Sequence, residues 1–268
     1  MSIILTINED DALSAEHRAC LDGLTASGGS VLPNKKAGFL NVASGGSRVT
    51  VVGPPLVAKW GVSTEFEGSS SKPSVQASIP DHTGKNAAFY EFSNLLSQKL
   101  LKLAQKEAKK FVVKKDLQND PQKVAGAFKK VVKENAKVDD STDQVIKTYD
   151  PSVRLKIDVV KNAGGGEVDF TNPASWKIEV CDVNMEALPI SKLVGKNITF
   201  VPRFEVRGLM STQPGISPQL VLQGAIVLER SAPTNSSANW GSCKILMPRA
   251  KKQRVASNDE EEVDDESS

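Results

Sequence analysis

Residues 153–160 read VRLKIDVV, a pattern typical of a β-strand. Apolar and polar positions alternate along it: Val153, Leu155, Ile157 and Val159 against Arg154, Lys156 and Asp158. Side chains of a β-strand point to opposite faces with a period of two, so the pattern predicts a strand with one buried and one exposed face. The exposed face carries two cations one pleat repeat apart, a spacing suited to following a phosphate backbone.

Several other segments have the composition of short strands bounded by Gly, Pro and Ser. They are SRVTVVGPPLVAKWGVSTEFEG (47–68), PSVQASIP (73–80), WKIEVCDV (176–183), NITFVPRFEVRGL (197–209) and PQLVLQGAIVLE (218–229). In residues 176–183, alternation places Trp176 with Ile178 and Val180, which favours a core role for it over a platform for DNA. About six short strands interrupted by one helical insertion favour a mainly β fold built on a small barrel.

The helical insertion covers about residues 86–137, where the apolar period changes to 3.6. In AFYEFSNLLSQKLLKLAQKEAKKF (88–111) one side is apolar: Phe92, Leu96, Leu100, Leu103 and Phe111. Another side, the lysine face, carries Lys99, Lys102, Lys106 and Lys109. A second helix is expected from the cap Asp120 and first-turn Pro121, with Val124, Phe128, Val131 and Val132 on its inner side.

Positive charge is concentrated in this insertion, because residues 95–137 hold twelve Lys and four acids. The lysine face is either a solvated helix surface or a contact for DNA. At the C-terminus, seven carboxylates lie within eight residues: Asp259, Glu260, Glu261, Glu262, Asp264, Asp265 and Glu266. Removing these seven charges from a chain of net charge +2 leaves a body of +9, which should attract polyanions.

Three regions are expected on these grounds. Residues 1–45 alternate short apolar runs with Gly, Ser and Asn, and indicate a loosely ordered N-terminal arm with one strand at most. Residues 46–232 form the folded domain, and residues 233–268 form a flexible tail.

Residues typical of enzymes and metal sites are sparse. His17 and His82 have no Cys, His or carboxylate at metal-ligand spacing, and the Gly-rich segments do not form a phosphate-binding loop. We therefore expect no enzymatic activity, cofactor or metal. Three distant cysteines, Cys20, Cys181 and Cys243, favour a reducing, intracellular location. We expect no signal peptide and no membrane partner.

The ordered set of segments resembles a known family. It resembles the single-stranded DNA-binding proteins of short-tailed phages and their relatives in nucleocytoplasmic large DNA viruses. The resemblance lies in the order of these segments: a strand ending in SIP, a helix, VRLKI, then WKIEVCDVNMEALPISKLVGKNITFVPRFEVRG and QLVLQGAIVLE. The resemblance runs from about residue 62 to residue 229. It implies a five-stranded OB-fold barrel with a helix packed beside it, a homodimer, and a sequence-tolerant groove for single-stranded DNA.

The resemblance also implies site residues. The family's basic strand matches VRLKI, which makes Arg154 and Lys156 the foremost DNA contacts. An aromatic stacking position of phage members falls near Arg207, just after Arg203 and Phe204. The remaining candidate contacts are Lys177, Lys196 and Trp60. With an arginine at the aromatic position, binding is expected to depend more on charge than on stacking.

The acidic tail is interpreted through the same resemblance. The resemblance implies that the tail mimics DNA and occupies the groove when DNA is absent. When DNA displaces the tail, the tail recruits replication enzymes such as polymerase and helicase-primase. Phage members end in an aromatic residue, whereas this chain ends Glu266, Ser267, Ser268. The implied processes are viral DNA replication, recombination and repair.

A basic cluster precedes the acids: Arg249, Lys251, Lys252 and Arg254. It fits a nuclear-import signal or a nonspecific nucleic-acid anchor, and favours a host nucleus or viral replication compartment. Ser257 lies three residues before Glu260 and is a candidate for phosphorylation by an acid-directed kinase.

Two other functional classes stay open. A histone-chaperone-like nuclear protein would use the acidic tract to shield basic partners, and would bind histones in preference to oligo-dT. A scaffold or virion protein would bind no nucleic acid. A solubilising role is the simplest alternative for the tail itself.

Overall fold

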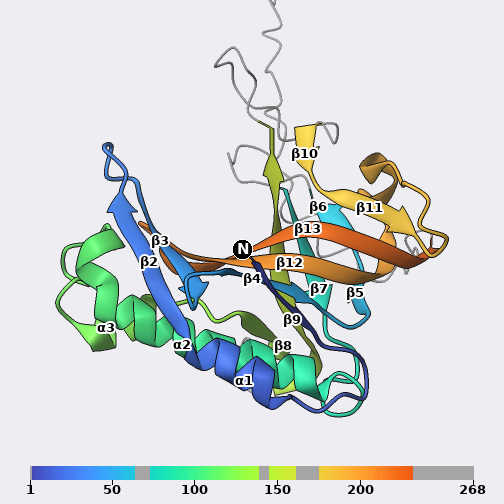
Figure 1. Cartoon of the computed structure of the whole chain (residues 1–268), viewed down its shortest axis with the longest axis horizontal. Helices are drawn as coiled ribbons and strands as arrows, with labels where there is room; N and C mark the ends of the chain where they lie inside the picture. Colours follow the sequence, from blue (N-terminus) through green and yellow to red (C-terminus); the bar gives the residue numbers. More distant parts are fainter. Residues whose placement is uncertain (1, 64–72, 139–144, 161–174, 232–268) are drawn as a thin grey trace, which may run out of the picture. The chain divides into compact units, whose positions relative to one another are not determined.

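A computed structural model describes residues 2–63, 73–138, 145–160 and 175–231, which are mainly β with three α-helices (Figure 1). The strands are β1 (Ser2–Thr6), β2 (Leu24–Val31), β3 (Ala37–Ser44), β4 (Arg48–Val52), β5 (Leu56–Ala58), β6 (Val62–Ser63), β7 (Ser74–Ser78), β8 (Val132–Val138), β9 (Val145–Val159), β10 (Trp176–Lys177), β11 (Glu179–Asp182), β12 (Asn197–Thr212) and β13 (Gly215–Ser231). The helices are α1 (Ala15–Asp22), α2 (Ala87–Phe111) and α3 (Pro121–Ala127), with a 3-10 turn η2 (Ile190–Leu193).

The two longest strands, β12 and β13, organise the sheet. They pair antiparallel from Asn197↔Ser231 to Thr212↔Gly215. The other edge of β12 pairs in turn with β5, β4 and β3. β9 pairs antiparallel with β7 and β8 and parallel with β13. The expectation of a mainly β chain with helices is confirmed, and the sheet is larger and more mixed than the five-stranded barrel expected.

The N-terminal residues belong to this sheet. β1 pairs parallel with β4, β2 pairs with β3, and β3 pairs with β12. The expectation of a loosely ordered arm over residues 1–45 is therefore wrong. The physical reason is that β4 and β12 supply backbone hydrogen-bond partners to β1 and β3, so these segments form strands although Gly, Ser and Asn interrupt their apolar runs.

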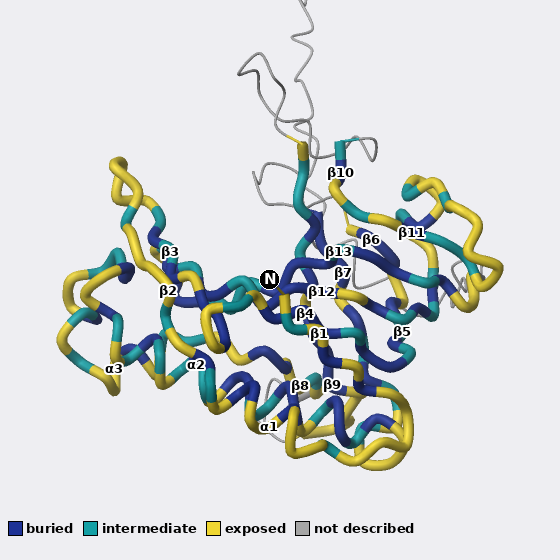
Figure 2. Tube along the Cα trace, in the orientation of Figure 1, coloured by how far each residue is buried: buried dark blue, intermediate teal, exposed yellow. Residues whose placement is uncertain are grey.

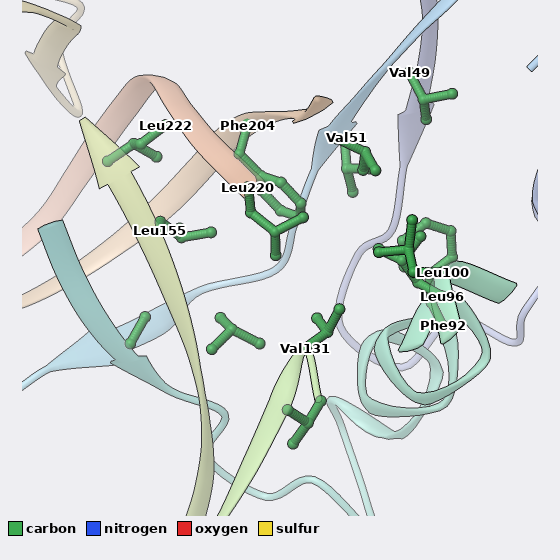
Figure 3. Close-up of a cluster of buried hydrophobic side chains, with 14 of the residues drawn as sticks. Val49, Val51, Phe92, Leu96, Leu100, Val131, Leu155, Phe204, Leu220 and Leu222 are labelled. Atoms are coloured by element: carbon green, nitrogen blue, oxygen red, sulfur yellow. The ribbon is translucent and has the colours of Figure 1, made fainter. Parts of the chain in front are cut away.

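Helix α2 supplies much of the core, as its apolar period predicted. Phe92, Leu96 and Leu100 are at most 1% exposed, and Figure 3 shows them facing a cluster that contains Phe204 and Leu220 from the strands. Figure 2 shows buried and exposed positions alternating along α2, so the helix buries one side only. This burial fixes α2 against the sheet, because each large apolar side chain removed from water contributes roughly 1.5–3 kcal/mol.

The second predicted helix begins as expected but ends earlier. The Asp120 side chain accepts hydrogen bonds from the backbone N–H groups of Gln122 and Lys123, and Pro121 occupies the first turn. The helix stops at Ala127, however, and Val132 begins β8. The extension of this helix to Val132 is wrong because β-branched residues here pair with β9 through Val132↔Val153.

Candidate nucleic-acid interface

Strand β9 has the two faces that its alternation predicted. Val153, Leu155 and Ile157 are at most 1% exposed and lie in the core. Arg154 and Lys156 point to the opposite side, which we call the outer face of β9; Arg154 is exposed and Lys156 is partly buried. In-register neighbours continue this face, because Ser74 and Gln76 of β7 lie opposite Lys156 and Arg154.

Two neutral polar groups accept hydrogen bonds from these cations. The Arg154 Nε donates to Ser74 Oγ at 3.1 Å, and the Lys156 Nζ donates to Gln219 Oε1 at 2.8 Å. Within the described residues, no carboxylate forms an ion pair with Arg154. A hydroxyl partner orients a guanidinium without cancelling its charge, so Arg154 keeps its attraction for a phosphate.

Arg207 has a different environment, because two carboxylates hold it. Its Nη1 lies 2.6 Å from Asp158 Oδ2, and its Nη2 lies 3.1 Å from Glu205 Oε2. Glu205 is only 3% exposed and also accepts a hydrogen bond from Gln223 at 3.0 Å. Burial alone would lower the pKa of Arg207, but the hydrogen bonds to Asp158 and Glu205 outweigh it and raise that pKa. Arg207 is thus a fixed, charge-compensated group rather than a mobile phosphate ligand.

Two other predicted DNA contacts, Arg203 and Lys177, also lie near carboxylates. Arg203 is directed to Glu179 of β11, with 3.2 Å between Nη2 and Oε2, and both side chains are well exposed. Lys177 is exposed and pairs in register with Asp158. The structure therefore brings Arg154, Lys156, Arg207, Arg203 and Lys177 to neighbouring strands, and interleaves them with acids.

Phe204 is not available to DNA, and its assignment as a contact is wrong. It is 2% exposed and packs edge-on against Phe89 of α2, with 6.3 Å between ring centroids. The reason is alternation along β12, where Arg203, Glu205 and Arg207 take the other face. Trp176 is 5% exposed, which confirms its predicted place in the core.

Trp60 and Lys196 lie together at the start of β12. Gly61 forms an isolated bridge with Val194. Trp60 directly precedes Gly61, and Lys196 lies two residues after Val194. Trp60 is 58% exposed and Lys196 is also exposed. Both therefore remain accessible, at the end of β12 away from Arg207.

The sequence did not indicate two concave regions beside the outer face. One is a cleft of about 380 Å³ lined by Lys59, Ser78, Asn135, Thr148, Tyr149 and Asp150. Tyr149 is 44% exposed there, with the Lys147 ammonium 5.1 Å from its ring centroid. The other is a hollow of about 80 Å³ beside Arg207, to which β3 contributes. Only the strand pairing brings β3 there, so no local sequence signal pointed to it.

The lysine face of α2 is directed away from the apolar side of that helix. Lys102, Lys106 and Lys109 are exposed. Lys99 forms an ion pair with Asp22 of α1 and lowers the pKa of that carboxyl. Part of this charge is thus used within the fold, and the other three lysines are exposed to solvent.

The acidic tail, the basic cluster, Ser257 and Cys243 lie outside the described residues. No helix in the described part of the chain is long and apolar enough to cross a membrane. Residues 2–63, 73–138, 145–160 and 175–231 contain no group of three or more His, Cys, Asp or Glu placed to hold a metal ion.

Comparison with known proteins gives similarity among solved structures alone. No family model and no curated protein matches the chain. Among solved structures, the chain is similar to the single-stranded DNA-binding protein from bacteriophage Enc34 in complex with ssDNA. The two chains share 11% identity with a TM-score of 0.36, over 76% of this chain and 97% of that one.

Proposed function

We propose that this protein binds single-stranded DNA on the outer face of β9. The observation that carries the proposal is the pair Arg154 and Lys156, which project from one side of a strand and are held by Ser74 and Gln219. Contacts of this kind reach phosphates and carry no base information, so binding is tolerant of sequence. The sequence resemblance described above favours the same polymer.

We infer that five strands form a barrel of the OB type. The inference is supported by their pairing, since β12 pairs with β5, β5 with β7, β7 with β9, β9 with β13, and β13 again with β12. The buried residues Leu155, Phe204 and Leu222 lie on these strands. A barrel of this kind carries its ligand on the outside of its strands, which suits the position of Arg154 and Lys156.

The wider role that we propose follows the resemblance. The protein acts without enzymatic activity in viral DNA replication, recombination and repair, as a homodimer, in the host nucleus or a viral replication compartment. Its acidic tail, residues 259–266, competes with DNA for the groove and recruits replication proteins. The basic cluster 249–254 serves import, and phosphorylation of Ser257 would add about −1.5 to −2 charge beside it.

A mobility-shift titration tests the binding activity. Oligo-dT and a duplex of equal length are titrated with the full chain at two salt concentrations. We expect oligo-dT to shift at a lower protein concentration than the duplex, and its affinity to fall at the higher salt, because bound phosphates release counterions. Equal or tighter binding of the duplex, or no shift of oligo-dT at low salt, would show that the proposed function is wrong. Preferential binding of histones would favour the chaperone alternative.

A further inference from the structure

The hollow beside Arg207, which we call the β3 hollow, lies where β3, β9, β12 and β13 meet. Its polar lining comes from Asn41, Lys156, Asp158, Arg207 and Gln219, and its aromatic lining from Phe39. Leu40 of β3, Gly208 and Leu209 of β12, and Val221 of β13 also line it. Because Lys156 belongs both to this hollow and to the outer face of β9, the hollow adjoins the proposed path of the DNA.

Gly208 allows the β3 hollow to form. Its φ is +144°, and a Cβ at this position would lie 1.9 Å from the backbone oxygen of Leu40. The register of β12 against β13 shifts between Val206 and Gly208, which marks a bulge. A bulge of this kind redirects side chains, and the missing Cβ lets β3 approach β12 closely.

Phe39 contributes the aromatic surface. It is partly exposed, whereas its neighbour Leu40 is 1% exposed, so the two side chains take opposite faces of β3. Asn41 lies two residues further on the same face as Phe39 and pairs in register with Gly208. An aromatic ring and an amide therefore reach the β3 hollow from a segment far from β9 in sequence.

Arg207 contributes a planar group of fixed orientation. Both of its terminal nitrogens are engaged, one by Asp158 and the other by Glu205. A guanidinium held in this way offers its flat face, and arginine planes stack on nucleobases as aromatic rings do. The combination of ring, guanidinium plane and amide beside a lysine is suited to an unstacked base whose phosphate lies outside the hollow.

We propose that the β3 hollow receives one nucleobase of the bound single strand, with Phe39 as the stacking residue. This inference rests on the proposed function, because the strand is held next to the hollow by Arg154 and Lys156. It assigns a base-binding role to β3, so that binding has a stacking component in addition to charge.

The test compares two ligands of equal length, oligo-dT and an oligonucleotide made only of abasic sites. Phe39→Leu keeps apolar volume and removes the ring, and Phe39→Tyr keeps the ring as a matched control. We expect Phe39→Leu to weaken oligo-dT binding at least about five-fold, to change binding of the abasic strand by less than about two-fold, and Phe39→Tyr to behave as the wild type. Equal losses on both ligands, or no loss on oligo-dT, would overturn the inference.

A second measurement uses the unmodified chain. Oligo-dT carrying 5-iodouracil is photocrosslinked to the protein, and the attached peptide is mapped by mass spectrometry. We expect a crosslink within Ala37–Ser44, and its absence while other residues crosslink would contradict the base pocket. If the wild type does not bind oligo-dT, the proposed function fails; if it binds and Phe39→Leu binds equally well, only this inference fails.

Discussion

Replacement of Gly208 by alanine tests how β3 is held against β12. The new Cβ would lie 1.9 Å from the Leu40 oxygen, a distance that real Cβ atoms do not reach, so one of the two strands must move. The backbone at Gly208 also has φ of +144°, a conformation that residues other than glycine adopt only with strain.

The two effects set the expected magnitude. Backbone strain of this kind costs about 1–3 kcal/mol, and forcing extra volume into a packed contact costs about another 1–3 kcal/mol. We therefore expect Gly208→Ala to lower the free energy of unfolding by about 2–6 kcal/mol. Gly126 in α3 provides the matched control, because a Cβ there meets nothing within 4 Å. Gly126→Ala should raise the free energy of unfolding by about 0.4–1 kcal/mol.

The assay is urea denaturation followed by circular dichroism, with both variants and the wild type measured together. A Gly208→Ala protein as stable as the wild type would refute the close approach of β3 to β12. It would also remove the physical basis for the β3 hollow, since that hollow depends on the bulge at Gly208.

Three further predictions concern the core, the cysteines and the tail. Phe204→Ala should destabilise the fold by about 3–5 kcal/mol, measured by urea denaturation, and should leave the oligo-dT affinity of the folded protein unchanged; a selective loss of affinity would return Phe204 to the interface. Burial raises the pKa of the Cys20 thiol, so at pH 8 Cys20 should be alkylated by iodoacetamide more slowly than Cys181, as followed by peptide mass spectrometry; equal rates would contradict the packing around Cys20. Deletion of residues 259–268 should tighten oligo-dT binding and steepen its salt dependence, and an unchanged affinity in a low-salt titration would exclude the mimic role.

Local sequence patterns predicted the helices and strands in which buried and exposed positions recur at a regular spacing. The alternation around Arg154 and the period of α2 both describe one buried side, and the structure has that side in each case. The N-terminal strands lack such a signal: β2 reads LTASGGSV, with most positions exposed, and its strand conformation comes from pairing with β3. Propensity is a weak guide where a partner strand supplies the hydrogen bonds.

In the candidate site too, local alternation predicts some features and distant strands determine the others. The faces of Arg154 and Lys156 follow from alternation alone, and alternation applied to RFEVR (203–207) would have excluded Phe204. The ion pair of Arg207 with Asp158 could not be inferred in this way, because Asp158 reaches it from β9, a strand with which β12 does not pair directly. The β3 hollow likewise depends on a glycine bulge and a strand far from β9 in sequence.

Two matched double variants test the central claim, that the outer face of β9 binds the DNA backbone. Arg154→Gln with Lys156→Gln removes two charges there, and Lys106→Gln with Lys109→Gln removes two from the lysine face of α2. Fluorescence anisotropy with labelled oligo-dT is measured over a range of salt concentrations.

For the double variant in β9 we expect the affinity for oligo-dT to fall at least about ten-fold at low salt. The slope of log affinity against log salt should decrease in magnitude by about 1.4. The α2 pair should stay within about two-fold of the wild type, because solvated lysines distant from the path contribute only through the overall field. An equal or larger loss for the α2 pair, or an unchanged salt slope for the β9 pair, would contradict the assignment of the DNA-binding face.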